Sequence, residues 1–137
     1  KEMFKTSGGK YVAPQVIENK FKESPFIEQI MVIGADRKFI SALIVPSLTN
    51  LKNYFEDHGL AWPVSTAELL KHERVQKLMD QQLHKFNEHF NHTEQIKKYA
   101  LLPQEWTVDT GEITPTLKLK RKVIMEKYCQ EIEAIYQ

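Results

Sequence analysis

The feature that most constrains the fold is a pair of apolar, β-prone segments joined by a short polar turn. Residues 26–33 and 39–45 are rich in isoleucine, valine, leucine and phenylalanine, and the turn between them runs from Gly34 to Lys38. Pro46 ends the second segment because proline has no N–H to give to a sheet. Two β-rich runs connected by so few residues predict an antiparallel hairpin.

Helices are predicted where apolar residues recur three and four positions apart and where start and stop residues flank them. The first predicted helix covers 14–22, with Val16, Ile17 and Phe21 as its apolar face. The second is capped by Ser47 or Thr49 and carries Leu51, Tyr54 and Phe55. A short helix from Ser65 or Thr66 through Leu70, a long helix over 73–90, and a last helix from Lys120 or Arg121 to Tyr136 follow. The predicted buried positions of the last helix are Ile124, Tyr128, Ile132 and Ile135.

Two further strands complete the predicted layout. One covers 3–6 and ends at the Ser7-Gly8-Gly9 turn, and the other covers 96–102, ends at Pro103, and is extended by 106–108. The order is then strand, helix, hairpin, three helices, strand, loop and helix. This order predicts one α+β domain, with a small mixed or antiparallel sheet of few strands packed by helices.

Composition limits the classes of function that the chain can have. A length of 137 residues fits one domain, and the formal net charge of +1 gives no global attraction to nucleic acid or to a membrane. No apolar run approaches the roughly 20 residues that span a bilayer. Cys129 is the only cysteine, which excludes an internal disulfide and predicts a reducing, cytoplasmic setting. We expect it to be a half-buried side chain, and we expect the five histidines to be solvated rather than zinc ligands.

The most distinctive segment is Gly111 to Lys122, GEITPTLKLKRK, predicted to be a stiff extended loop ahead of the last helix. Residues 117–127 hold five lysines or arginines and one glutamate, a local excess of four positive charges. Cations are unfavourable at a helix N-terminus, so a polyanionic ligand is expected to favour them there. Taken alone, the segment is also compatible with a solvated helix start or a basic patch for nucleic acid or anionic lipid.

Two motifs resemble those of a known family. Glu112 to Lys122, EITPTLKLKRK, is similar to the C-terminal lysine motif of AMP-forming acyl-CoA synthetases, in the long-chain fatty acid branch of the adenylate-forming superfamily. Lys5 to Pro14, KTSGGKYVAP, is similar to the segment that follows the interdomain hinge in the same family. The resemblance implies that residues 1–137 form the C-terminal lid domain of a longer synthetase, whose N-terminal AMP-binding domain lies outside this sequence.

The resemblance also implies roles for particular residues. Lys118 would be the adenylation lysine, with Lys120 as its rival, and the backbone of Ser7, Gly8 and Gly9 would line the CoA channel after the domain rotates. ATP, CoA and a fatty acid would be the substrates, and Mg²⁺ would be bound mainly by the N-terminal domain. No nucleic-acid partner is expected. The binding residues lie mostly in the other domain, so the fragment alone is expected to be inactive.

Several alternatives stay open at this point. The chain opens KEMFK without an initiator methionine, which we interpret as a piece of a longer protein. The acid could be an aryl or short-chain acid, because this domain does not line the acyl pocket. A non-enzymatic α+β module with a basic anion-binding loop is the other alternative. Peripheral association with a membrane is also left open by the sequence.

Overall fold

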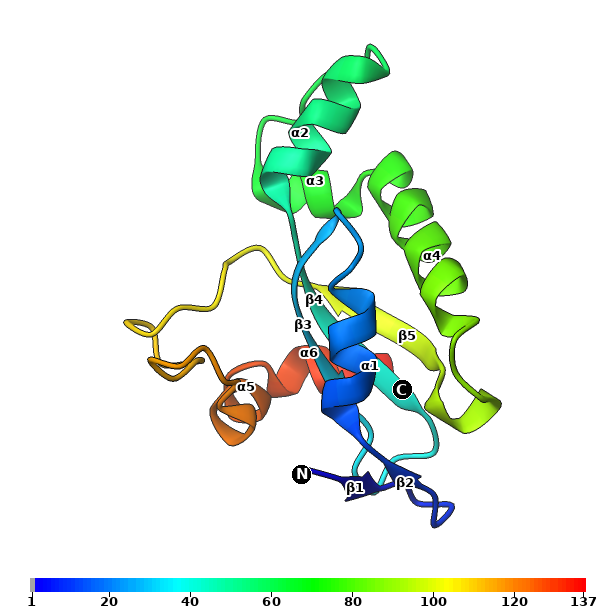
Figure 1. Ribbon diagram of the computed structural model, residues 1–137. Helices are drawn as coiled ribbons and strands as arrows, with labels where there is room; N and C mark the ends of the chain where they lie inside the picture. Colours follow the sequence, from blue (N-terminus) through cyan, green and yellow to red (C-terminus); the bar gives the residue numbers. More distant parts are fainter. Residues whose placement is uncertain (1) are drawn as a thin grey trace.

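The computed structural model describes residues 2–137 and confirms an α+β architecture with two small sheets (Figure 1). The larger sheet has the order β3-β4-β5, formed by β3 (Ile27–Ile33), β4 (Ile40–Pro46) and β5 (Ile96–Leu101). Strands β3 and β4 are antiparallel, which confirms the predicted hairpin, and β5 runs parallel to β4. The smaller sheet pairs β1 (Phe4–Lys5) with β2 (Tyr11–Val12).

Helices cover both faces of the larger sheet. On one face α1 (Pro14–Phe21) and α4 (Glu73–Asn87) pack against Ile40, Ala42 and Ile44 of β4. On the other face α5 (Arg121–Lys127) and α6 (Cys129–Ile135) pack against Leu43 and Val45. Successive side chains of a strand point to opposite faces, so every residue of β4 is buried.

A third cluster lies at one end of the sheet, where α2 (Leu48–Asp57) and α3 (Thr66–Lys71) meet the start of α4 (Figure 1). Ser47 and Ser65 are the N-caps of α2 and α3, and their hydroxyls accept the N–H groups of Asn50 and Glu68 at 3.3 and 3.2 Å. A short 3₁₀ helix, His92–Glu94, leads into β5. None of the helices among residues 2–137 has the length and apolar character needed to cross a bilayer.

The predictions for α1, the last helix and Cys129 need correction. The buried face of α1 is Pro14, Ile17, Glu18 and Phe21, whereas Val16 is 53% exposed.

The last helix is interrupted at Tyr128, whose ψ of 29° is not helical, so α5 and α6 are separate helices that share one core. All four residues predicted to be buried there are buried. Cys129, the first residue of α6, is exposed rather than half-buried.

Residues 106–108 do not extend a strand, contrary to the prediction. The side-chain amide of Gln29 instead pairs with the backbone of Trp106, accepting its N–H at 2.7 Å and donating to its carbonyl at 2.9 Å. Strand β3 is an edge strand, and Gln29 lies on the same face of it as Met31 and Ile33, which pack in one cluster with Trp106. The segment is therefore attached to the sheet without becoming part of it.

The Ser7-Gly8-Gly9 turn joins β1 to β2, so the smaller sheet is a β-hairpin. It is fastened to the turn between β3 and β4: Ser7 N–H donates to the carbonyl of Arg37, and Asp36 N–H donates to that of Lys5, both at 2.9 Å. Gly34 allows this contact, because a Cβ there would lie 2.7 Å from Ile40 Cγ2 and 2.8 Å from Phe4 Cε1.

Candidate functional site

The lysine-rich segment forms a tight hairpin rather than the extended loop that its sequence predicts. Ile113 and Leu119 form an antiparallel bridge, and Thr114 N–H donates to the Lys118 carbonyl at 2.9 Å. Leu117 N–H donates to the Thr114 carbonyl at 2.7 Å, and the Thr114 hydroxyl accepts Lys118 N–H at 3.1 Å. The loop at the tip is Pro115 to Leu117. Lys118 is thus the first residue of the returning arm.

The Lys118 side chain is exposed, and within residues 2–137 its ammonium makes no hydrogen bond or ion pair. It borders a groove of about 900 Å³ between the hairpin, α1 and the start of β3. Other residues on the groove are Glu18, Asn19, Gln29, Trp106 and Arg121. The lysine is therefore free to reach a group outside this domain.

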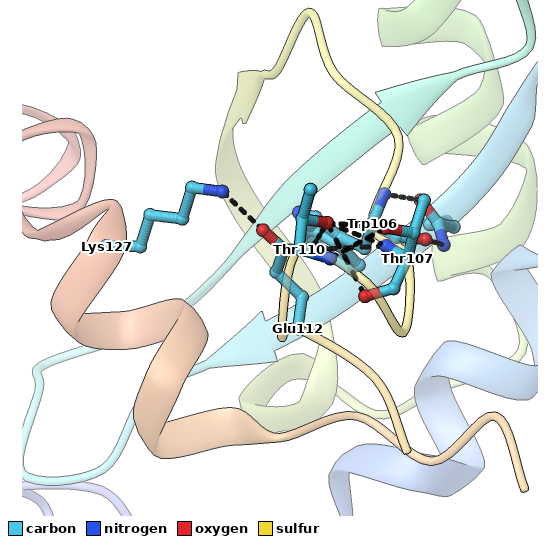
Figure 2. A network of polar contacts seen from close by, with 6 residues as sticks. Trp106, Thr107, Thr110, Glu112 and Lys127 are labelled. Atoms are coloured by element: carbon cyan, nitrogen blue, oxygen red, sulfur yellow. Dashed lines mark hydrogen bonds and ion pairs between the residues drawn. The ribbon is translucent and has the colours of Figure 1, made fainter. Parts of the chain in front are cut away.

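Glu112 anchors the arm that enters the hairpin (Figure 2). Its carboxylate, 1% exposed, accepts hydrogen bonds from Lys127 Nζ, Thr110 Oγ1 and, at 3.1 Å, Thr107 N–H. Burial opposes ionisation of this carboxyl, but the three donors outweigh it and lower the pKa of Glu112 to about 2. The Glu112 carbonyl also accepts Lys120 N–H at 2.7 Å. Glu112 thus binds the loop at Thr107 and Thr110, the last turn of α5 and the returning arm of the hairpin.

Arg121 anchors the arm that leaves the hairpin. Its two terminal nitrogens donate to the two carboxylate oxygens of Glu18, both at 2.7 Å, and its Nε donates to Glu2 at 2.9 Å. Glu18 is buried in α1 and also accepts the N–H of Val32 on β3 at 2.7 Å. Burial opposes the charge on Arg121, but Glu18 and Glu2 outweigh it, so the Arg121 pKa is raised above its ordinary value. This bidentate pair joins α1, β3 and α5.

These contacts divide the basic cluster into two kinds of residue. Arg121 and Lys127 are paired with the buried carboxylates Glu18 and Glu112. Lys118, Lys120 and Lys122 are exposed, and no ion pair involves them among residues 2–137. The expectation that a polyanion must account for the cations at the helix start is therefore wrong for Arg121, because an internal carboxylate accounts for it.

The Ser7–Gly9 turn lies apart from the lysine hairpin, and none of its residues borders the groove beside Lys118. Gly9 has a φ of +85°, and its N–H donates to the Thr6 carbonyl at 2.9 Å. Gly8 is exposed, and within the described residues its N–H has no hydrogen-bond partner. The structure does not bring the two sequence-predicted sites together, and each lies on its own hairpin.

Sequence reasoning missed the two carboxylates that hold the hairpin. For Glu18 a signal was present, because positions 14, 17, 18 and 21 share one face of a helix, and a glutamate on a buried face needs a cationic partner. For Glu112 and Lys127 there was no comparable signal. Their ion pair depends on the path of the chain between Glu112 and α5, which no local sequence pattern encodes.

This fold, with its anchored lysine hairpin, matches the C-terminal domain of adenylate-forming enzymes. The chain belongs to the AMP-binding enzyme C-terminal domain family, whose sequence model matches residues 2–137. This family membership confirms the resemblance found in the two motifs, and it places both of them within the matched region.

The chain is similar to curated ligases over almost its whole length. It is 38% identical to a long-chain-fatty-acid–CoA ligase of Mycobacterium tuberculosis, a match that covers 99% of this chain and 23% of the ligase. It is 30% identical to long-chain-fatty-acid–CoA ligase 5 of Mus musculus, covering 100% of this chain and 20% of that protein. The chain therefore spans about a fifth of the length of these relatives.

Solved structures share the fold. The adenylation domain of a carboxylate reductase from Mycobacterium chelonae superposes with a TM-score of 0.78 at 23% identity, covering 98% of this chain and 19% of that one. A fatty acyl CoA synthetase of Mycobacterium tuberculosis superposes with a TM-score of 0.56 at 18% identity, covering 92% of this chain and 19% of that one.

The Glu112 anchor predicts a characteristic dependence of stability on pH. The carboxyl has an ordinary pKa of 4.5 and a folded pKa of about 2, so its contribution to the free energy of unfolding is complete above pH 5 and is lost as the pH falls towards 2. Glu112→Gln should lower the free energy of unfolding of the chain by about 3 kcal/mol at pH 7, and the difference from wild type should vanish near pH 2.

Urea denaturation of the 137-residue chain between pH 2 and pH 7 measures this difference. Glu126→Gln, an exposed position on α5, is the matched control and should change the free energy of unfolding by no more than about 0.5 kcal/mol. A Glu112→Gln difference that stayed constant over the whole pH range would contradict the assigned ion pair.

Proposed function

We propose that the chain works as the C-terminal domain of a long-chain fatty acid–CoA ligase, and that Lys118 is its adenylation lysine. The observation that carries the proposal is an exposed ammonium, unpaired among residues 2–137, on a hairpin held at both ends by buried carboxylates. In the reaction, a carboxylate oxygen of the fatty acid attacks the α-phosphorus of ATP. The bond from that phosphorus to the bridging oxygen breaks, and pyrophosphate leaves acyl-AMP behind.

A lysine suits this step because both reactants are anions. Their mutual repulsion opposes the approach, and negative charge shifts over the phosphoryl oxygens in the transition state. A positive charge inserted between them offsets both effects. Lysine supplies a compact charge on a long stem, and the anchored hairpin supplies the fixed base from which the stem extends.

The second half-reaction is assigned to the Ser7–Gly9 turn. After the domain rotates, the backbone of this turn would line the channel for the pantetheine arm of CoA. The CoA thiolate attacks the acyl carbon of acyl-AMP, the thioester bond forms, and AMP leaves with the electrons of the broken acyl–oxygen bond. An open Cβ position and an unbonded N–H at Gly8, within the described residues, support this role.

The identity of the acid rests on the curated relatives, which are fatty-acid ligases. Another carboxylic acid is the second candidate, favoured by the carboxylate reductase among the similar structures. A non-enzymatic anion-binding module is less consistent with the site, because two of its five cations are already paired internally. We expect the ligase to act in the cytoplasm.

ATP and CoA are substrates of the proposed reaction, and Mg²⁺ accompanies ATP. Mg²⁺ in such sites is usually held by one or two carboxylates together with the phosphates of the nucleotide. We propose that the N-terminal domain supplies most of these ligands.

Replacement of Lys118 should separate the two half-reactions of the full-length ligase. Lys118→Ala should slow acyl-AMP formation by at least 100-fold, because it removes the charge that offsets repulsion in the adenylation transition state. Thioester formation from supplied acyl-AMP should stay within about threefold of wild type, because Lys118 is then withdrawn.

Pyrophosphate exchange measures the first half-reaction, and acyl-CoA release measures the second. Lys120→Ala, two residues along the same arm, is the matched control and should have a much smaller effect on adenylation. The 137-residue chain alone should give no turnover. An equal loss in both half-reactions for Lys118→Ala would rule out the assignment.

Replacement of Gly8 should slow thioester formation rather than adenylation. A Cβ at Gly8 meets only Thr6 Oγ1, at 4.0 Å, so the domain itself tolerates a side chain there, whereas Gly9 needs its positive φ. Gly8→Leu should slow thioester formation about tenfold or more by narrowing the channel and leave adenylation nearly unchanged. Gly8→Ala should fall between Gly8→Leu and wild type. Unchanged acyl-CoA synthesis by Gly8→Leu would show that the turn does not line the channel.

A further inference from the structure

Leu117, the residue before Lys118, combines two features that are unfavourable for the domain by itself. Its φ is +66°, in the left-handed region, and its side chain is 73% exposed. Among residues 2–137 only one other non-glycine residue, Asp36, has a positive φ. Aspartate enters this region more readily because its short polar side chain can bond to nearby backbone, which leucine cannot do.

The hairpin itself demands the left-handed backbone at this position. Pro115 to Leu117 is a three-residue hairpin loop, in which the third residue is left-handed and is ordinarily glycine. Glycine would make the same turn without strain and without exposing an aliphatic side chain to water. Most of the leucine side chain is not covered by the domain itself, which favours a use for it on another surface.

The neighbourhood of Leu117 indicates which surface that is. Leu117 borders the same groove as Lys118, yet it stays largely exposed, so the groove does not cover it. Consecutive Cα atoms are about 3.8 Å apart, so a protein surface that receives Lys118 also lies within reach of Leu117. An aliphatic side chain gains little from phosphate groups, which need charge or hydrogen-bond donors, so its contact is with protein rather than with the nucleotide.

We propose that the Leu117 side chain docks into an apolar depression on the N-terminal domain of the same ligase when Lys118 enters the ATP site, and thereby positions the ammonium. This inference rests on the proposed function. Leu117 acts as a positioning residue: burial of its side chain on docking favours the adenylation arrangement of the two domains. The contact is broken when the domain rotates, so the thioester step does not use it.

The test is a set of Leu117 variants in the full-length ligase, with both half-reactions measured. Leu117→Gly and Leu117→Asn both suit a left-handed backbone and both remove the aliphatic surface. Each should slow adenylation by about tenfold or more, without lowering the melting temperature, and leave thioester formation from supplied acyl-AMP within about twofold. Leu117→Met keeps an apolar side chain of similar volume and should restore most of the adenylation rate.

The controls separate docking from loop flexibility and from the function of Lys118. Val64→Asn removes an aliphatic side chain that is 91% exposed elsewhere on the domain and should not change adenylation. Wild-type adenylation by Leu117→Asn, with or without a defect in Leu117→Gly, would overturn the proposal, since flexibility alone would then explain any loss. Equal losses in both half-reactions would also overturn it. Lys118→Ala is measured in parallel. If Lys118→Ala adenylates at the wild-type rate, the proposed function fails. If Lys118→Ala loses adenylation while Leu117→Asn keeps the wild-type rate, only the docking role of Leu117 is refuted.

Discussion

The bidentate ion pair between Glu18 and Arg121 is the interaction on which the arrangement of the domain most depends. Glu18 receives two hydrogen bonds from the guanidinium and one from the Val32 N–H, so both of its oxygens are satisfied although the side chain is buried. A carboxylate removed from water without such partners would be costly, and loss of either member leaves the other charge buried and unpaired. The pair therefore fixes where α5 begins relative to α1 and β3, and with it the position of the lysine hairpin.

The parallel pairing of β4 with β5 explains why a long helical segment lies between these two strands in the sequence. Parallel neighbours cannot be joined by a tight turn, so the chain has to cross over before β5 can pair with β4. Helices α2, α3 and α4 make this crossover, and α4 returns across one face of the sheet. The other face is left for α5 and α6. Both faces of β4 are thereby covered, which accounts for the burial of every one of its residues.

Local sequence signals predicted most of the elements but little of the site geometry. The hairpin of β3 and β4 follows from patterns within a few residues, and so does one of the two cap candidates given for each of α2 and α3. The break at Tyr128 and the pairing of Gln29 with Trp106 depend on contacts between distant segments, which no local pattern encodes. Family resemblance singled out Lys118 and the Ser7–Gly9 turn. It did not indicate the carboxylates that anchor the lysine hairpin.

The two hairpins are attached to the same pair of strands. Ser7 bonds to the turn between β3 and β4, while Glu18, bound to Val32 of β3, holds Arg121 at the end of the lysine hairpin. Both hairpins therefore move with the β3–β4 unit, and neither needs a hinge of its own. If the chain has the proposed function, a rotation that turned one hairpin towards the active site would turn the other with it. Because the two lie apart on the domain, one such rotation could exchange the lysine for the glycine turn between the two proposed half-reactions.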